Sequence, residues 1–352
     1  MKKVMAVVLI AVLLINLNAC TSKKETRYEA SFLELFDTVT TIVGYAKDEA
    51  EFKEKTQMIY DQLMEYHKLY DIYHDYEGIN NIKTINDNAG KEPVKVDQKI
   101  INLLLFSKSV YEKTEGNTNV AFGAVLSIWH AYRTAGIDDP EHAKLPPMEE
   151  LKEAAKHTSI EDVIIDEAAS TVYLKDAKMS LDVGAIAKGY ATEMVSRYAI
   201  SQGFTNGMLS VGGNVRTIGH KLSGEGEEIP WSVGIQNPGL DDKDEALFVL
   251  NLEGYSLVTS GVYERYYTVE GKKYHHIINT HTLMPQNNYL SVSIISKDSG
   301  LADGLSTAIF DLSLVEGQKL IESMPDTEAL WVLSDGEMAY SDGFMALVKK
   351  SN

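Results

Sequence analysis

Cysteine is nearly absent from this sequence: its 352 residues contain one, Cys20, so no disulfide can form within the chain. Basic residues are also scarce, with 33 lysines and arginines against 51 aspartates and glutamates, and the formal net charge is −18. Because binding to nucleic-acid phosphates needs clustered basic side chains, we expect no nucleic-acid partner. Internal repeats and low-complexity linkers are missing as well. The length therefore suggests one large domain or two ordinary ones.

The features that are present begin with an export signal. Lys2 and Lys3 precede an apolar run from Val4 to Leu17, and small residues lead to Cys20. This order is typical of the basic, apolar and cleavage-site regions of a secretory signal peptide. The residues before Cys20 resemble a bacterial lipoprotein box, in which the cysteine is lipidated and becomes the mature N-terminus. A retained membrane anchor and plain secretion are the alternatives.

These features predict three segments. Residues 1–19 form the signal peptide, 20–30 a polar tether lipidated at Cys20, and 31–352 the folded domain. We expect the protein to be exported and lipid-anchored to the outer face of the bacterial cytoplasmic membrane.

Hydrophobic periodicity predicts a mixture of helices and strands in the folded domain. Apolar residues recur at helical spacing over 48–73, 98–113, 148–157, 301–312 and 315–324. Strands are predicted over 32–45, 163–165, 171–174, 179–183, 207–215, 231–235, 247–252, 255–259, 266–269, 290–295, 330–333 and 344–348. The segment 71–86 has neither pattern and is expected to be a loop. Helices and strands are partly segregated along the chain, which favours an α+β fold with largely antiparallel sheets and flanking helices.

The segment 180–195, SLDVGAIAKGYATEMV, combines a predicted strand, a turn at Gly184 and a helix. The first N–H groups of a helix lack intrahelical partners and lie at the positive end of its dipole, so they can bind phosphate. Lys188 lies in the first turn, where a cation is disfavoured unless an anion lies in front of it. Asp182, before the turn, can orient a ligand hydroxyl or amide. The alternative is an ordinary glycine turn with an exposed lysine.

Two other segments place polar groups at glycines. The sequence VGGN at 211–214 allows a ligand to approach the backbone closely, or it is simply a turn. The sequence TSGVYER at 259–265 contains two hydroxyls, a glycine and an ion pair, and its structural alternative is a strand corner with a surface salt bridge.

Histidines are concentrated in the segment 275–281, HHIINTH. We do not interpret it as a zinc site, because adjacent histidines in a strand point to opposite faces and no cysteine completes a tetrahedron. His276 is either a buried, hydrogen-bonded histidine or a proton-transfer group.

The segment 302–307, ADGLST, offers oxygen ligands. Asp303 and Thr307 lie four residues apart on one helical face, and a carboxylate with a hydroxyl suits Mg²⁺ that keeps water or phosphate as its other ligands. The alternative is that Asp303 is only the N-cap of the following helix.

In their order and spacing these segments resemble the ApbE family of flavin transferases, also described as FAD:protein FMN transferases. The resemblance runs from about Phe32 to about Val348. Its most specific pieces are DVGAIAKGY at 182–190, SVGGNV at 210–215, TSGVYER at 259–265, HIIN at 276–279 and ADGLSTA at 302–308.

The resemblance implies an ApbE-like fold for residues 31–352 and a set of site residues. The residues implied to contact FAD are Phe36, Tyr73, Asn117, Thr118, Asn119, Asp182, Lys188, His276 and Ile277. Mg²⁺ is implied to lie near the FAD pyrophosphate, bound by the Ala185 carbonyl, Asp303 and Thr307. Three departures from the family stand out. Phe36 replaces a common methionine, residues 117–119 replace a common Ala-Phe-Asp, and Asn279 begins a turn where Asp-Pro is commoner.

The resemblance also implies an activity, which is Mg²⁺-dependent transfer of FMN from FAD to a threonine hydroxyl of exported redox proteins, with AMP released. His276 and Asp303 are both candidates for the base. Two alternatives stay open: an FAD pyrophosphatase that yields FMN and AMP, and a non-catalytic flavin-binding lipoprotein. A solute-binding lipoprotein is disfavoured, since such proteins usually have two α/β lobes.

Overall fold

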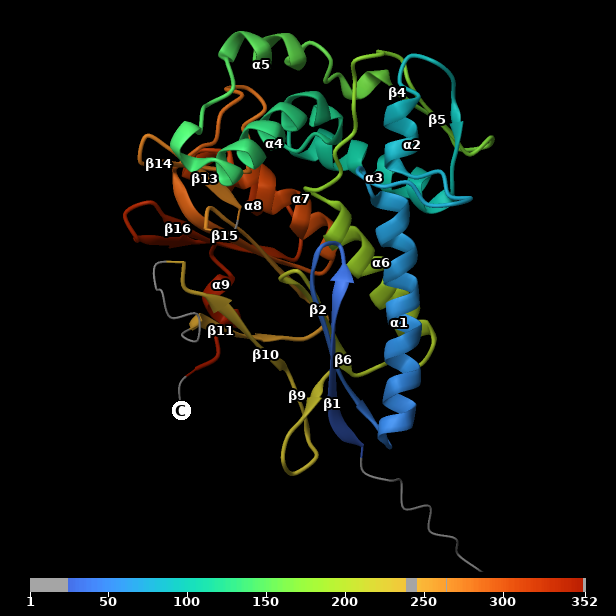
Figure 1. Ribbon diagram of the computed structural model, residues 1–352. Helices are drawn as coiled ribbons and strands as arrows, with labels where there is room; N and C mark the ends of the chain where they lie inside the picture. Colours follow the sequence, from blue (N-terminus) through green and yellow to red (C-terminus); the bar gives the residue numbers. More distant parts are fainter. Residues whose placement is uncertain (1–24, 239–245, 264, 351–352) are drawn as a thin grey trace, which may run out of the picture.

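The computed structural model describes residues 25–238, 246–263 and 265–350 of the chain (Figure 1). The predicted signal peptide and the lipidation site Cys20 lie outside these residues. The centre of the fold is an eight-stranded sheet, in which every neighbouring pair of strands is antiparallel. In spatial order its strands are β1 (Thr26–Leu35), β2 (Thr38–Ala46), β6 (Gly207–Val211), β7 (Asn214–Ile218), β12 (Ser256–Gly261), β15 (Tyr289–Ser296), β16 (Thr327–Leu333) and β17 (Met338–Tyr340).

Helices cover one face of this sheet. They are α1 (Glu49–Tyr70), α6 (Ala187–Ser201), α7 (Ser299–Phe310) and α8 (Leu314–Glu322). The other face packs against a ribbon of β10 (Trp231–Gln236) and β11 (Ala246–Leu252) and against α9 (Phe344–Leu347). Successive strand residues therefore enter different cores: Val258 and Ile294 pack on the helical side, and Leu257 and Ile295 on the other. This is the period of two that a strand buried on both faces requires.

The remaining elements lie beyond the helical layer, mostly at the end of the molecule that holds α4 and α5 (Figure 1). The helices are α2 (Ile82–Asp87), α3 (Gln98–Lys113), α4 (Gly123–Asp138) and α5 (Met148–Ala155), with short 3-10 turns at Val120–Phe122, Pro140–His142 and Ile160–Asp162. The short strands are β3 (Val94–Lys95), β4 (Val163–Asp166), β5 (Thr171–Leu174), β8 (Lys221–Leu222), β9 (Glu228–Ile229), β13 (Tyr266–Val269) and β14 (Lys272–His275). No helix in the described ranges combines the length and the apolar content needed to cross a bilayer.

The α+β prediction with antiparallel sheets is confirmed, and α3 has the predicted bounds. The strand expected over 32–45 is instead a hairpin that turns at Phe36 and Asp37. Its first strand begins at Thr26, so residues 26–30 of the predicted tether pair with β2. Tyr28 and Ala30 alternate with exposed residues along this strand, and that alternation gives the segment a face to bury.

Three other local predictions were wrong. The segment 179–183 is extended but joins no sheet, because its backbone bonds to the Asn86 side chain and to the main chain of Val120 and Gly123. The loop expected over 71–86 contains the start of α2, which a capping box between Asn81 and Thr84 initiates. Residues 344–347 form the single-turn helix α9 rather than a strand.

Candidate active site

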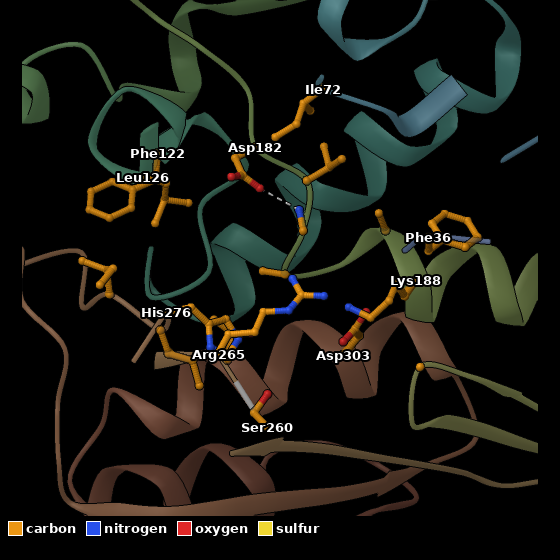
Figure 2. Close-up of a pocket in the computed structure, with 18 of the residues that line it drawn as sticks. Phe36, Ile72, Phe122, Leu126, Asp182, Lys188, Ser260, Arg265, His276 and Asp303 are labelled. Carbon is orange, nitrogen blue, oxygen red and sulfur yellow. Dashed lines mark hydrogen bonds between the residues drawn. The ribbon is translucent and has the colours of Figure 1, made fainter. Parts of the chain in front are cut away.

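A cavity of about 300 Å³ lies where the helical layer meets the α4 end of the molecule. Its wall is formed by the β1–β2 turn, the loop after α1, α4, the turn before α6, the end of β12, residues 276–280 and α7 (Figure 2). The sequence-predicted site residues that line it are Phe36, Tyr73, Asn117, Asn119, Asp182, Ala185, Lys188, His276, Ile277, Asp303 and Thr307. Motifs far apart in the chain thus meet in one place.

Thr118 is the predicted residue that lies outside this lining. It is buried, and its hydroxyl donates to the Gly304 carbonyl at 2.7 Å. Asn117 and Asn119 line the cavity but also bond to the main chain: Asn117 Nδ2 donates to the Thr114 carbonyl, and Asn119 Oδ1 accepts the Ala121 N–H. These three residues therefore join the wall to α7 and to the 3-10 turn that leads into α4.

The turn before α6 is held by its own side chains. Asp182 Oδ1 accepts the Gly184 N–H at 2.9 Å, a bond that is visible in Figure 2. The Val183 carbonyl then accepts the N–H groups of Ile186 and Ala187 at 3.0 and 2.8 Å. One Asp182 oxygen is therefore used to shape the turn, and the other remains for a ligand.

The sequence suggested that the first N–H groups of α6 could bind a phosphate, but two of them are already bonded within the protein. The Ala187 N–H bonds to Val183, and the Gly189 N–H donates to Asp303 Oδ2 at 2.7 Å, so both amides already have protein partners. Anion attraction at this point comes from the Lys188 side chain, which lines the cavity next to Asp303 (Figure 2). The dipole of α6 adds to it.

Asp303 lies in the second turn of α7 and is not its N-cap, a role that Asp298 performs by accepting the Leu301 N–H. The Asp303 side chain is buried, with the residue 5% exposed. Burial raises the pKa of its carboxyl above the ordinary value of 3.8, while the Lys188 ammonium, the Gly189 N–H and the nearby Asn214 amide oppose that rise. The bond that holds the carboxylate comes from the Gly189 N–H of α6.

The predicted metal ligands fit a hard cation. Ala185, Asp303 and Thr307 line the same cavity, and one Asp303 oxygen bonds to Gly189, which leaves the other for a different partner. Within the described residues, no three His, Cys, Asp or Glu side chains gather as a metal cluster. The available set is one carboxylate, one hydroxyl and a carbonyl, which suits Mg²⁺ that takes its remaining ligands from water or phosphate.

His276 faces the cavity from the segment after β14. Burial first, and then the positive charges of Arg265, Arg133 and Lys188, together lower the pKa of its imidazole to about 3. Its Nδ1 is buried and has no hydrogen-bond partner among the described residues. His276 is therefore a neutral imidazole in a cationic surrounding, with a nitrogen that protein groups do not occupy.

The contribution of α4 to the cavity wall was not predicted from the sequence. Phe122, Leu126, His130 and Arg133 follow one another at helical spacing and all line the cavity. Burial raises the pKa of Tyr73 to about 12 and lowers that of His130, so both side chains are neutral near pH 7. The Tyr73 hydroxyl lies 2.8 Å from His130 Nδ1, and the two groups share a hydrogen bond. The two rings stack with centroids 5.9 Å apart and planes 11° apart. The helical period of this row was the signal that could have revealed it.

Arg265 also lines the cavity, although it was not among the predicted site residues and a strand corner with a surface ion pair was the structural alternative for its segment. Its side chain extends toward Lys188 and Asp303 (Figure 2), while Glu264, the expected partner, lies outside the described residues. Burial and the charge of Arg265 lower the pKa of Arg133, so the two guanidinium groups share one region of the cavity. This region is suited to an anionic ligand.

Hydroxyls connect the end of β12 to α7. Ser260 Oγ lies 2.8 Å from Ser306 Oγ, and Ser306 donates to the Asp303 carbonyl at 2.8 Å. Near this point Gly212 and Gly213 turn β6 into β7 with φ angles of 56° and 87°, which glycine adopts freely. The two glycine-containing motifs thus form the wall of the cavity next to α7.

Known proteins with similar sequences belong to the ApbE family of flavin transferases. The sequence model of the ApbE family matches residues 36–331. The chain is 30% identical over 263 residues to an FAD:protein FMN transferase of Klebsiella pneumoniae, covering 74% of this chain and 78% of that one. It is 32% identical over 278 residues to the FAD:protein FMN transferase of Treponema pallidum, covering 76% and 75%.

Solved structures agree in fold. The ApbE protein of Thermotoga maritima superposes with a TM-score of 0.79 and 29% identity, covering 92% of this chain and 100% of that one. The flavin transferase ApbE of Vibrio cholerae gives a TM-score of 0.74 at 23% identity, covering 92% and 99%, and at that identity it supports the fold alone. With a family model that spans most of its length and relatives similar over three quarters of it, this chain belongs to the ApbE family.

Proposed function

We propose that this protein transfers FMN from FAD to a threonine hydroxyl of exported redox proteins, with Mg²⁺ bound and AMP released. The observation that carries the proposal is the meeting of Lys188, Asp303 and Thr307 in one cavity that also has aromatic walls at Phe36 and Tyr73. The first group suits a pyrophosphate and its metal, and the second suits the flat flavin ring. The names of the relatives support the same activity.

The chemistry exchanges one phosphorus–oxygen bond for another. The threonine Oγ bonds to the phosphorus of the FMN half, the bond from that phosphorus to the bridging oxygen breaks, and AMP leaves with the bridging oxygen. The Ala185 carbonyl, Asp303 and Thr307 would hold Mg²⁺, which would supply positive charge to neutralise the pyrophosphate. Lys188 and Arg265 add positive charge beside it, where charge builds up on the leaving phosphate.

The threonine hydroxyl must lose its proton during attack. His276 is better placed than Asp303 to accept it, because its Nδ1 has no partner in the part of the chain that the structure describes, whereas the Asp303 carboxylate is bonded to Gly189. The phosphates of FAD counteract the cationic surroundings that depress the pKa of His276, and so raise its affinity for a proton. Asp303 then serves mainly as a ligand.

An FAD pyrophosphatase is the second candidate, since water in place of threonine gives free FMN. The stacked Tyr73 and His130 rings favour transfer, because they cover one side of the cavity and restrict water there. A flavin-binding lipoprotein without activity is the third candidate.

Incubation of the protein with FAD, Mg²⁺ and an envelope protein that bears an exposed threonine distinguishes these three candidate functions. Transfer gives AMP and an acceptor heavier by one FMN. Hydrolysis gives AMP and free FMN with no labelled protein, and a binding protein gives no AMP.

We infer that the activity is located outside the cytoplasm. The order of Lys2, Lys3, the apolar run to Leu17 and Cys20 supports export followed by lipid anchoring at the outer face of the cytoplasmic membrane. Replacement of Cys20 by serine is expected to release the protein from the membrane fraction or to stall its processing. Unchanged membrane association of Cys20→Ser with residues 1–19 removed as in the wild type would exclude lipidation as the anchor.

A further inference from the structure

The β1–β2 hairpin turns at two residues whose backbone is strained. Phe36 and Asp37 have φ angles of 53° and 52°, in the left-handed region that residues other than glycine rarely occupy. A bulky aromatic residue is especially unfavourable there. Both residues line the site cavity. Asp37 tolerates this conformation, but Phe36 has no intrinsic preference for it, so a contact that holds Phe36 in place is expected.

That contact comes from α1. The Phe36 N–H donates to His67 Nδ1 at 3.1 Å, and the two rings meet edge to face with centroids 5.6 Å apart. Because a backbone N–H can only donate, His67 Nδ1 is the acceptor, and in the neutral ring the proton therefore lies on Nε2. His67 thus bonds to the strained residue and also packs against its side chain.

The other nitrogen of His67 points to the loop that carries Tyr73. His67 Nε2 lies 3.4 Å from the Tyr76 hydroxyl, which donates to Asp71 Oδ2 at 2.8 Å. Asp71 Oδ1 in turn accepts the Tyr73 N–H at 2.6 Å. The Asp71 side chain is 5% exposed, so the carboxylate at the centre of this chain of bonds is shielded from water. One imidazole therefore connects Phe36 with the backbone of Tyr73.

We propose that His67 is a positioning residue for the flavin, which holds Phe36 and the Tyr73 loop as two walls of the ring-binding end of the cavity. The inference rests on the proposed function, since it takes the flavin of FAD as the ligand. A wall that is held before the ligand arrives does not have to be ordered during binding, and this raises affinity. His67 need not touch the flavin to act in this way.

Two substitutions at His67 distinguish its role as hydrogen-bond acceptor for the Phe36 N–H from the role of its imidazole ring as a whole. His67→Leu removes the acceptor for Phe36, whereas His67→Asn keeps an oxygen close to the position of Nδ1. We expect His67→Leu to raise the KM and the Kd for FAD about tenfold, with kcat within about twofold of wild type. His67→Asn keeps the acceptor but loses the Nε2 contact with Tyr76, so we expect its KM and Kd to rise by only about threefold, with kcat again near wild type. His142, an exposed histidine that pairs with Asp139, supplies the matched control His142→Leu, which should change nothing.

A second substitution tests the strain directly. Glycine adopts the backbone of Asp37 freely, so His67→Leu combined with Asp37→Gly should recover most of the lost FAD affinity. A purely structural role for His67 would lower the thermal unfolding midpoint and leave the Kd for FAD unchanged.

Four results would overturn the inference. They are a wild-type Kd in His67→Leu, a loss in His67→Asn as large as in His67→Leu, no recovery in the double variant, and a wild-type protein that binds no FAD. The last would remove the proposed function as well, whereas the first three would leave flavin transfer by the wild type intact.

Discussion

The Gly189 N–H in the first turn of α6 donates to Oδ2 of Asp303 in the second turn of α7, at 2.7 Å. This bond crosses between two helices that are far apart in the sequence. A Cβ at position 189 would lie 2.4 Å from the Asp303 Cβ and 2.3 Å from the Ser299 carbonyl oxygen, so only glycine permits the approach. The same contact sets Lys188 beside Asp303, and the distance between the two helices therefore determines the geometry of the site.

Gly189→Ala is expected to force α6 and α7 apart, because its Cβ would overlap the Ser299 carbonyl oxygen, and that backbone atom can move only if the helix moves. We expect a loss of about 1–3 kcal/mol in the free energy of unfolding and loss of FMN transfer. Urea denaturation and AMP release measure the two effects. At Gly224 an added Cβ meets nothing within 4 Å, so Gly224→Ala is the control and should cost less than about 0.5 kcal/mol. Equal behaviour of the two variants would disprove the close-approach argument.

Asp303→Asn tests the charge of the proposed metal ligand. Its side-chain oxygen can still accept the Gly189 N–H, so we expect the fold to persist while AMP release falls at least about 100-fold. Titration of activity with Mg²⁺ should show a much higher requirement for the metal. Turnover comparable to wild type at low Mg²⁺ would remove Asp303 from the set of ligands.

The depressed pKa of His276 predicts how stability varies with pH. Its pKa is about 3 in the fold against an ordinary 6.5, so between these values the unfolded chain binds a proton that the folded chain does not. Stability is therefore lost as the pH falls below 6.5, at about 1.4 kcal/mol per unit from this residue. His276→Gln removes that dependence. From pH 7 to pH 5 the unfolding free energy of the wild type should drop about 2 kcal/mol more than that of the variant. Equal drops would show that His276 titrates normally.

The carboxyl group of Asp311 has the opposite effect on how stability depends on pH. Both carboxyl oxygens are buried without hydrogen-bond partners among the described residues, and burial raises the pKa well above its ordinary value of 3.8. The folded state therefore keeps a proton that the unfolded state loses, and stability is lost as the pH rises above 3.8. Asp311→Asn has no such group, so its unfolding free energy should exceed that of the wild type by more than about 1 kcal/mol at pH 8. The advantage should shrink by pH 5, and a constant difference would contradict the explanation.

Tyr73 is expected to influence the choice between threonine and water. Tyr73→Asn removes the ring that stacks on His130, so we expect a larger share of free FMN relative to labelled acceptor. Tyr73→Phe keeps the ring and loses only the hydroxyl bond to His130, and it should stay close to wild type. Chromatography of free FMN and the mass of the acceptor give the ratio. An unchanged ratio in Tyr73→Asn would show that water is excluded by other groups.

The sequence predicted those parts of the fold whose signals are local. Helix α3 follows from its apolar period and from the N-cap Asp97, whose side chain accepts the Lys99 N–H. Several residues that line the cavity, among them Asp182, Lys188 and Asp303, could be singled out because they lie in short motifs of polar groups and glycines. Phe36, Tyr73 and Ile277 followed only from the resemblance to the ApbE family.

The features that the sequence did not predict depend on tertiary contacts. The turn at Phe36 and Asp37 has no glycine, since His67 rather than a local preference stabilises it. The segment 179–183 alternates like a strand, but the side chain of Asn86 satisfies the backbone at Leu181 in place of a neighbouring strand. The role of Asp303 was ambiguous for the same reason: only the fold shows that Asp298 is the cap and that Asp303 is a buried carboxylate bonded to Gly189.

The alternation of β12 between two cores restricts how this site can evolve. Val258 and Ser260 share the face toward α7, while Leu257 packs against the opposite core. An insertion or deletion of one residue within β12 would exchange the two faces, expel Val258 from its core and carry Ser260 away from Ser306. Lineages that change acceptor preference are therefore free to vary loops around the cavity, but the length of β12 should be invariant among them.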